Sequence, residues 1–441
     1  MHVCRKWRAV VFGSPRRLNL RLRCTNSTPV RGTIDAWPLL PILVVGFGHA
    51  KGGVDNIVAA LEHNDRIREL DFYSSPSPDM DKVLAAMHRP FPALTYLGLE
   101  STVETVPVDS SSFLGGSAPQ LQQLRLNSIP FPGIPKLLLS TTHLVILELR
   151  SIPHSGYIPP EVMVTGFAVL TSLERLSISF ESPRSRPDRR YRGPPPPTRT
   201  LLPALQYLWF CGVSEYLADL VARIDAPVLD KLDIKFFHQL LFDTPQLSQF
   251  ICRTPKIKAC DGARAEFSSR GATIVWALRL EISCRQSDWQ LSSLAQVCSS
   301  GLVPAVKHVW IIERKGDPPS WQDDIEISQW LELLHPLTAV KDLYISQGLT
   351  PHIAPALQEI VGGIVTEVLP ALETLYLEET LASEPVQESI GKFVAARQLA
   401  GRPIAISQWK ADAYLEHVAA VTRKGELLSD GLYPQFILLD K

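Results

Sequence analysis

Apolar residues recur along the chain in one short pattern, L-x-x-L-x-L, in which valine or isoleucine often takes the place of leucine. The stretch FPALTYLGLES at 91–101 returns as LPALQYLWFCG at 202–212 and as LPALETLYLEE at 369–379. The alternation at the end of each copy predicts a short β-strand with one buried face. The copies that begin at Ile257 and Val275 match the pattern least well. The first apolar residues of the copies are Ile67, Leu94, Leu121, Leu144, Leu173, Leu205, Leu229, Ile257, Val275, Val306, Val340 and Leu372.

A second regularity precedes the apolar residues. Proline stands two residues before the first of them in many copies, and threonine takes that place in most others. Proline cannot continue a helix and donates no backbone hydrogen bond, so we expect a strand to begin at this point of each copy. The prolines are Pro92, Pro119, Pro203, Pro227, Pro255, Pro304 and Pro370.

Between the copies the apolar spacing becomes helical. In VDNIVAALEHN, Val54, Ile57 and Leu61 fall on one face of a helix, and the same spacing recurs at 79–89 and 213–224. The sequence therefore predicts a repeated strand–helix unit, and such a unit buries its apolar face only by stacking on a neighbouring copy.

The repeated unit resembles the leucine-rich-repeat family, in the form that has longer repeats and a helix on the outer side. The family's asparagine or cysteine after the third leucine is mostly missing from this sequence. The resemblance implies an α/β fold, an irregular right-handed horseshoe of about twelve repeats with a parallel concave sheet and helices outside. We expect this solenoid to span residues 25–405.

The stretch VVGFGHAKGGVDNIVAAL at 44–61 invites a different interpretation, a turn that binds a nucleotide. A dinucleotide fingerprint needs a third glycine where Lys51 stands, and a phosphate-binding loop needs a hydroxyl residue where Gly52 stands. Both motifs fail at a residue that would contact the ligand. The sequence here favours one more strand–turn–helix unit and no cofactor.

The N-terminal segment, residues 1–24, lies outside the repeat. Its sequence VCRKWRAVVFGSPRRL resembles the second half of an F-box, as found in fungal proteins that join an F-box to irregular leucine-rich repeats. The resemblance implies docking on the small adaptor subunit of a cullin–RING ubiquitin ligase. The alternative is a helical cap on the N-terminal end of the solenoid. The residues carried over for either role are Val3, Cys4, Trp7, Val10, Pro15 and Leu18.

The concave face of the expected sheet is the candidate surface for a protein partner. Side chains between the last two apolar residues of each copy point away from the core. These positions run through Asp71, Gly98, Arg125, Glu148, Ser177, Trp209, Asp233, Gly262, Arg279, Trp310, Tyr344 and Tyr376.

Three consecutive copies carry an aromatic residue at this position, Trp310, Tyr344 and Tyr376, and these predict an aromatic stripe on the concave face. Trp and Tyr are the residues most often found as binding hot spots. The alternative is that the amphipathic C-terminal segment covers the stripe. We assign residues 406–441 to a helical tail, and 183–200, rich in proline and arginine, to a solvated loop. The other predicted partner-binding residues are His308 and Asp342 beside the stripe, with Tyr207 and Trp209 as a separate anchor.

Composition narrows the class of protein. Lysine plus arginine (44) nearly equals aspartate plus glutamate (45), which argues against nucleic-acid binding. Seven scattered cysteines are typical of reduced thiols in a protein of the cytoplasm or nucleus. No apolar stretch is long enough to cross a membrane. We find no catalytic, metal-ligand or cofactor motif, so we expect neither an enzyme nor a cofactor.

Together these features predict a protein-interaction module that is monomeric outside its complex. The resemblance implies the substrate-recognition subunit of a cullin–RING ubiquitin ligase, with a target protein on the concave face. Because only half of the F-box pattern is present, the alternative is a leucine-rich-repeat scaffold unconnected to ubiquitination.

Overall fold

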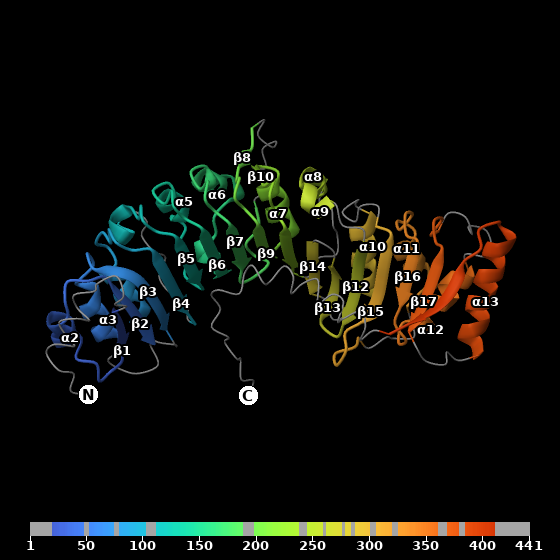
Figure 1. Cartoon of the computed structure of the whole chain (residues 1–441), viewed down its shortest axis with the longest axis horizontal. Helices are drawn as coiled ribbons and strands as arrows, with labels where there is room; N and C mark the ends of the chain where they lie inside the picture. The colour runs from blue at the N-terminus through green and yellow to red at the C-terminus, as the bar shows by residue number, and fades with distance from the viewer. Residues whose placement is uncertain are drawn as a thin grey trace, which may run out of the picture. The chain divides into compact units, whose positions relative to one another are not determined.

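The computed structural model of the chain describes residues 20–47, 53–74, 79–102, 112–187, 198–237, 245–258, 262–275, 278–283, 287–299, 306–319, 325–359, 368–378 and 384–410. The chain divides into two compact units, coloured from blue to yellow and from yellow to red in Figure 1. The first comprises residues 1–260, 273–284 and 299–304, and the second comprises 261–272, 285–298 and 305–441.

The first unit is built on a parallel sheet in which every neighbouring pair of strands runs in the same direction. A separate two-stranded sheet joins β8 (Thr200–Leu201) to β10 (Ile224–Asp225). The main sheet has the order β1 (Leu20–Cys24), β2 (Ile42–Phe47), β3 (Ile67–Ser74), β4 (Tyr96–Ser101), β5 (Gln123–Asn127), β6 (Ile146–Ile152), β7 (Arg175–Phe180), β9 (Tyr207–Gly212), β11 (Lys231–Phe236) and β14 (Leu278–Ser283).

The helices of the first unit lie along one side of this sheet (Figure 1). The helices predicted from apolar spacing are confirmed as α3 (Gly53–Leu61), α4 (Asp79–Ala86) and α7 (Ser214–Val221). The others are α2 (Val30–Ala36), α5 (Ile134–Leu138), α6 (Pro160–Phe167), α8 (Pro245–Arg253) and α9 (Pro255–Lys258), with short 3-10 turns at Phe113–Gly116 and His154–Gly156.

The second unit repeats the arrangement. Its parallel strands are β12 (Gly262–Ser268), β15 (His308–Glu313), β16 (Asp342–Ile345), β17 (Thr374–Glu378) and β18 (Ala405–Trp409). Its helices are α10 (Ser287–Ser299), α11 (Ile327–Leu334), α12 (Thr350–Glu359) and α13 (Glu384–Leu399), while β13 (Gly271–Val275) lies across the boundary of the two units.

Aliphatic ladders hold each sheet to its helices. In the first unit one buried leucine follows another in register on neighbouring strands, and in the second unit Val309, Leu343 and Leu375 do the same. Each ladder removes apolar surface from water only because the next strand is present, which is the basis of repeat stability. The parallel α/β leucine-rich-repeat fold is therefore confirmed. The ladder of the first unit is Leu70, Leu97, Leu124, Leu147, Leu176, Leu208 and Leu232.

The recurring proline occupies a tight turn that precedes the strand. The N–H of Leu94 donates a 3.2 Å hydrogen bond to the carbonyl of Phe91, which makes Pro92 the second residue of a β-turn, and β4 begins at Tyr96. Proline suits this turn position because its φ is already near −65° and its N–H is not required. The same three-residue closure recurs at Leu121, Leu144, Leu173, Leu205, Leu229, Val340 and Leu372.

One predicted copy is wrong. Pro255 begins helix α9, and Ile257 is buried within that helix instead of leading into a strand. The next strand, β12, begins at Gly262. Proline is also favoured in the first turn of a helix, so its presence alone does not separate the two structures.

Gly46 has a packing role in the glycine-containing stretch, of which residues 48–52 lie outside the described residues. A side chain at Gly46 would overlap Ile57 Cδ1 of helix α3 and would lie 3.1 Å from Phe72. The glycine therefore allows α3 to pack closely on β2, as the strand–helix interpretation requires.

The sheets extend beyond the predicted solenoid at both ends, since β1 begins at Leu20 and β18 ends at Trp409. The tail predicted from residue 406 thus begins as a strand, and its remainder, 411–441, lies outside the described residues. Most of the 183–200 loop lies outside them as well. So do the predicted adaptor or cap residues, Val3, Cys4, Trp7, Val10, Pro15 and Leu18.

Candidate functional site

Among the described residues no helix lies on one face of the first unit's sheet, and polar and aromatic side chains line that face. Strand pairing places the residues between the buried leucines in one row, as the repeat pattern predicts. This row is Asp71, Gly98, Arg125, Glu148, Ser177, Trp209, Asp233 and Arg279.

Arginine side chains lie over aromatic rings on this face. The guanidinium of Arg150 lies 5.7 Å from the ring centre of Trp209, and that of Arg175 lies 4.9 Å from Tyr207. Arg150 on β6 thus reaches past β7 to β9, and Ser177 on β7, the register partner of Trp209, is buried. Cation–π contacts of this kind hold both partners in place.

Glu148 is the most buried charge of this face. Its carboxylate lies 3.1 Å from Arg150 and 3.9 Å from Arg125, and its side chain is only 6% exposed. Two cations compensate the buried carboxylate, which without a partner would be strongly destabilised.

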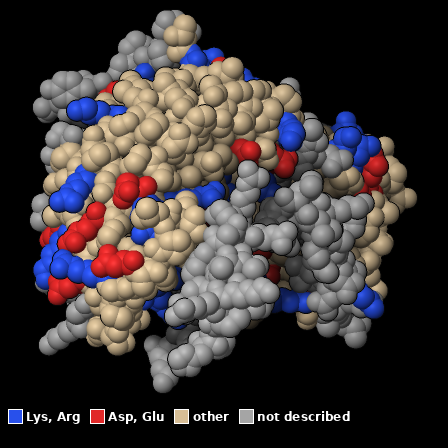
Figure 2. Space-filling model, turned by 60° about the vertical axis from the view of Figure 1, so that its left-hand side comes forward, with Lys and Arg blue, Asp and Glu red and all other residues tan. Residues whose placement is uncertain are grey.

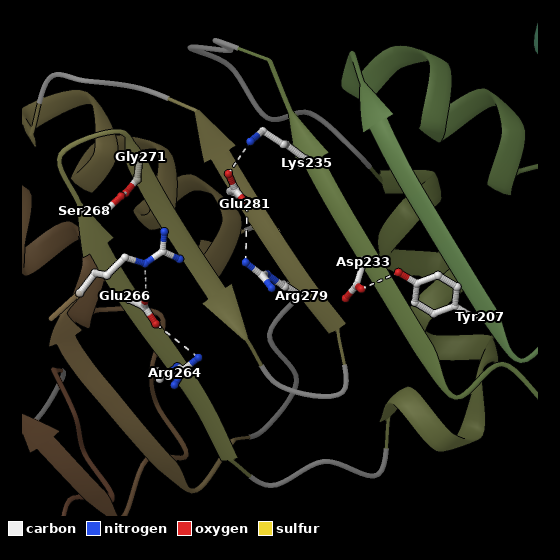
Figure 3. Close-up of polar contacts among 10 residues, drawn as sticks. Tyr207, Asp233, Lys235, Arg264, Glu266, Ser268, Gly271, Arg279 and Glu281 are labelled. Carbon is white, nitrogen blue, oxygen red and sulfur yellow. Dashed lines mark hydrogen bonds and ion pairs between the residues drawn. The ribbon is translucent and has the colours of Figure 1, made fainter. Parts of the chain in front are cut away.

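The predicted anchor Tyr207 takes part in a polar contact. Its hydroxyl donates a 2.9 Å hydrogen bond to Asp233 on the neighbouring strand (Figure 3). Further along the same sheet, Glu281 pairs with Lys235 at 2.6 Å and with Arg279 at 3.7 Å. The charges of this face are largely paired with one another.

The second unit carries the predicted aromatic stripe, and its rings are stacked. The ring centres of Trp310 and Tyr344 are 4.8 Å apart with 17° between the planes, and those of Tyr344 and Tyr376 are 4.2 Å apart with 7°. The three residues are register partners on neighbouring strands. Their rings stack because the distance between neighbouring strands, about 4.8 Å, is close to the distance between stacked rings. All three side chains are partly exposed.

Arg264, and not Gly262, extends the row of the stripe on β12, because Arg264 pairs with Trp310. The repeat pattern placed this position two residues too early. Gly262 has a different role, since a side chain there would lie 3.0 Å from the Trp310 ring. Arg264 and Arg314 both contact the Glu266 carboxylate, at 3.3 Å and 2.6 Å (Figure 3).

His308 and Asp342 lie beside the stripe, as predicted, and their side chains meet at 2.8 Å. Trp409 is an additional aromatic neighbour: its ring packs edge-on against Tyr344 at 5.8 Å. Burial raises the pKa of Tyr344 to about 12, and the nearby Tyr376 and Asp342 contribute to the increase. The Tyr344 hydroxyl therefore stays protonated at neutral pH.

Sequence reasoning missed Arg264 and Trp409. The first lies in a copy whose apolar spacing is lost, and the second is the last residue of β18, AISQW, a strand that has no leucine pattern and lies almost wholly in the predicted C-terminal tail. The sequence feature that could have predicted β18 is the repeat order itself, in which a strand follows each helix.

The described residues contain no group of three His, Cys, Asp or Glu side chains arranged to hold a metal ion. Within the same residues, no helix combines the length and the apolar character needed to span a bilayer. On the face seen in Figure 2, basic and acidic side chains lie next to one another. This distribution agrees with the near balance of charge in the sequence.

Comparison with known proteins gives a likeness among solved structures. No known family model matches the chain, and no curated protein matches it either. Among solved structures it is similar to the leucine-rich-repeat-containing protein LegL7 from Legionella pneumophila, with 11% identity and a TM-score of 0.29, over 85% of this chain and 97% of that one. The fold assignment rests on the strand pairing described above.

Proposed function

We propose that this chain is a protein-interaction module, and that the open sheet face of the second unit anchors a protein partner. The observation that carries the proposal is the stack of Trp310, Tyr344 and Tyr376 on that face. Leu343 and Leu375 on the opposite face already supply the core, so the partly exposed rings are not needed to fill it. Rigid aromatic side chains of this kind are the usual anchors of protein interfaces.

A comparison of variants tests the proposal. Proteins that co-purify with the wild-type chain from its native cells should be lost from the double variant Trp310→Ala/Tyr376→Ala. The matched control is Trp289→Ala, because Trp289 is an exposed tryptophan (44%) on helix α10. Circular dichroism of all three proteins checks that they are folded. The same partners bound to the double variant and to the wild type would contradict the proposal.

The finer proposal is that the module selects substrates for a cullin–RING ubiquitin ligase. Its support is the sequence resemblance to the second half of an F-box near Trp7 and Pro15. The purified adaptor subunit should bind the chain, or a chain extended upstream, and Trp7→Ala should weaken that binding. If the adaptor binds neither version, the ubiquitin role is excluded and the repeat scaffold without a link to ubiquitination takes its place.

A further inference from the structure

The ring stack of the second unit ends on a tyrosine face that no described ring covers. Stacking between neighbouring strands means that each ring face points along the sheet, from one strand to the next. One face of Tyr376 lies against Tyr344, and the other points toward β18, where Ser407 is its register partner. Ser407 is exposed and too small to cover a phenol ring.

The charge around this uncovered face is negative. The open-face positions of β16, β17 and β18 include the carboxylates of Glu378 and of Asp342, which contacts His308 at 2.8 Å, and none of these described positions is Lys or Arg. Lys341, just before β16, is paired with Glu373 at 2.6 Å. The positions are Asp342, Tyr344, Thr374, Tyr376, Glu378, Ala405, Ser407 and Trp409.

We propose that this place is a recognition site for an arginine side chain of a protein partner. The guanidinium would stack on the free face of Tyr376 above Ser407, and the carboxylate of Glu378 on the same strand would contribute negative charge nearby. The inference rests on the proposed function and names the chemistry that the partner brings to it.

Arginine fits the site better than other side chains for three reasons. Its guanidinium is planar, so it continues a stack of parallel rings, whereas the ammonium of lysine is compact and strongly hydrated. Its positive charge is attracted to the ring face and to the neighbouring carboxylates. Glu378 accepts a 2.9 Å hydrogen bond from the backbone N–H of Gln347, which fixes its negative charge two residues from Tyr376 on the same strand.

A peptide probe tests the site directly. Acetyl-Gly-Gly-Arg-Gly-Gly-amide is compared with the same peptide containing citrulline, which has nearly the same shape without the charge, and with the lysine peptide. Saturation-transfer NMR on the full-length protein reports contact through the side-chain methylene protons of the peptide. We expect the strongest transfer for the arginine peptide and binding about two- to fivefold weaker for citrulline.

Variants locate the contact. Tyr376→Leu should reduce transfer to the arginine peptide, Tyr376→Phe should keep it, and Glu378→Gln should weaken it. Ser407→Arg places a guanidinium beside the ring from within the chain, so it should block the peptide, while Ser407→Gln should not. Near-UV circular dichroism verifies that the rings left unchanged, including the Trp310–Tyr344 pair, keep their packing in each variant.

Two outcomes overturn the inference: equal transfer to the arginine and citrulline peptides, or transfer unchanged by both Tyr376→Leu and Ser407→Arg. If partners are nevertheless lost from the Trp310→Ala/Tyr376→Ala variant, the proposed function stands and the arginine site alone falls. A dimer that forms with increasing concentration and is abolished by Tyr376→Leu would show that a second copy of the chain occupies the site. That result would overturn the inference that a different protein supplies the arginine.

Discussion

The indole N–H of Trp409 donates a 3.1 Å hydrogen bond to the backbone carbonyl of Ile345, 64 residues earlier in the chain. The bond joins the edge strand β18 to β16 across β17, and the Trp409 ring packs edge-on against Tyr344. Four of the five residues of β18 are exposed, and Trp409 is the buried one. Trp409 therefore adds a side-chain attachment to the backbone pairing of β18 with β17.

Trp409→Phe should loosen this edge. The variant keeps an aromatic ring but leaves the buried carbonyl of Ile345 without its donor, at a cost of about 1 kcal/mol in the free energy of unfolding. The loss should be visible as a lower thermal midpoint and as faster amide exchange in β17 and β18. Gln408→Ala, at an exposed position of the same strand, is the control and should behave as wild type; equal midpoints for the two variants would contradict the role of the bond.

The end of the aliphatic ladder predicts a contrast between two register partners. Leu375 is fully buried, and Ile406, which pairs with it on β18, is 50% exposed. Leu375→Ala should cost about 2–5 kcal/mol through lost burial and a cavity, and Ile406→Ala less than about 1 kcal/mol. Urea unfolding of both variants measures the difference. Similar losses at the two positions would mean that Ile406 is covered in solution.

Gly98 lies beneath a polar contact of the first unit, so its substitution should be destabilising. A side chain there would lie 2.6 Å from Asp71 Oδ1 and 2.7 Å from the Tyr96 hydroxyl, which hydrogen-bond to each other. Gly98→Ala should therefore cost about 1–3 kcal/mol.

Gly32 supplies the matched control for that substitution. It lies in helix α2 with nothing within 4 Å of an added Cβ, so Gly32→Ala should raise the free energy of unfolding by about 0.5–1 kcal/mol. Thermal unfolding of the two variants compares the effects. A Gly98→Ala protein as stable as Gly32→Ala would show that the Asp71–Tyr96 contact is not maintained.

Periodicity predicted most of the fold because each repeat carries its strand leucines and its apolar helix face within one short stretch of sequence. Where a strand lacked the pattern, the prediction failed. Ile257 has the expected proline before it, yet it is helical, because proline serves both a turn and a helix start. β18 was missed because its sequence, AISQW, has Ile406 at the ladder position but Gln408 where the next apolar residue of the pattern is expected.

The row of the candidate site was predictable for the same reason. Register follows from the repeat, so Trp310, Tyr344 and Tyr376 were assigned to neighbouring strands from spacing alone. Ring orientation was not predictable, because stacking depends on rotamers that neighbouring side chains select. The crossing of Arg150 to Trp209 was missed for a related reason: it joins strands that are not neighbours in the sheet.

Buried thiols predict a loss of stability at high pH. Burial raises the pKa of Cys298 on α10 to about 12, from an ordinary value of 9.0. Above pH 9 the unfolded chain therefore loses this proton while the folded chain keeps it, so the free energy of unfolding falls as the pH rises from 9 toward 12. At pH 10 this thiol should lower the free energy of unfolding by about 1 kcal/mol relative to pH 7. Urea unfolding under reducing conditions at pH 7 and pH 10 should show a smaller decrease for Cys298→Ala than for wild type. Cys252→Ala, at an exposed cysteine of α8, should retain the wild-type decrease, and a Cys298→Ala protein with the wild-type pH dependence would contradict the assignment.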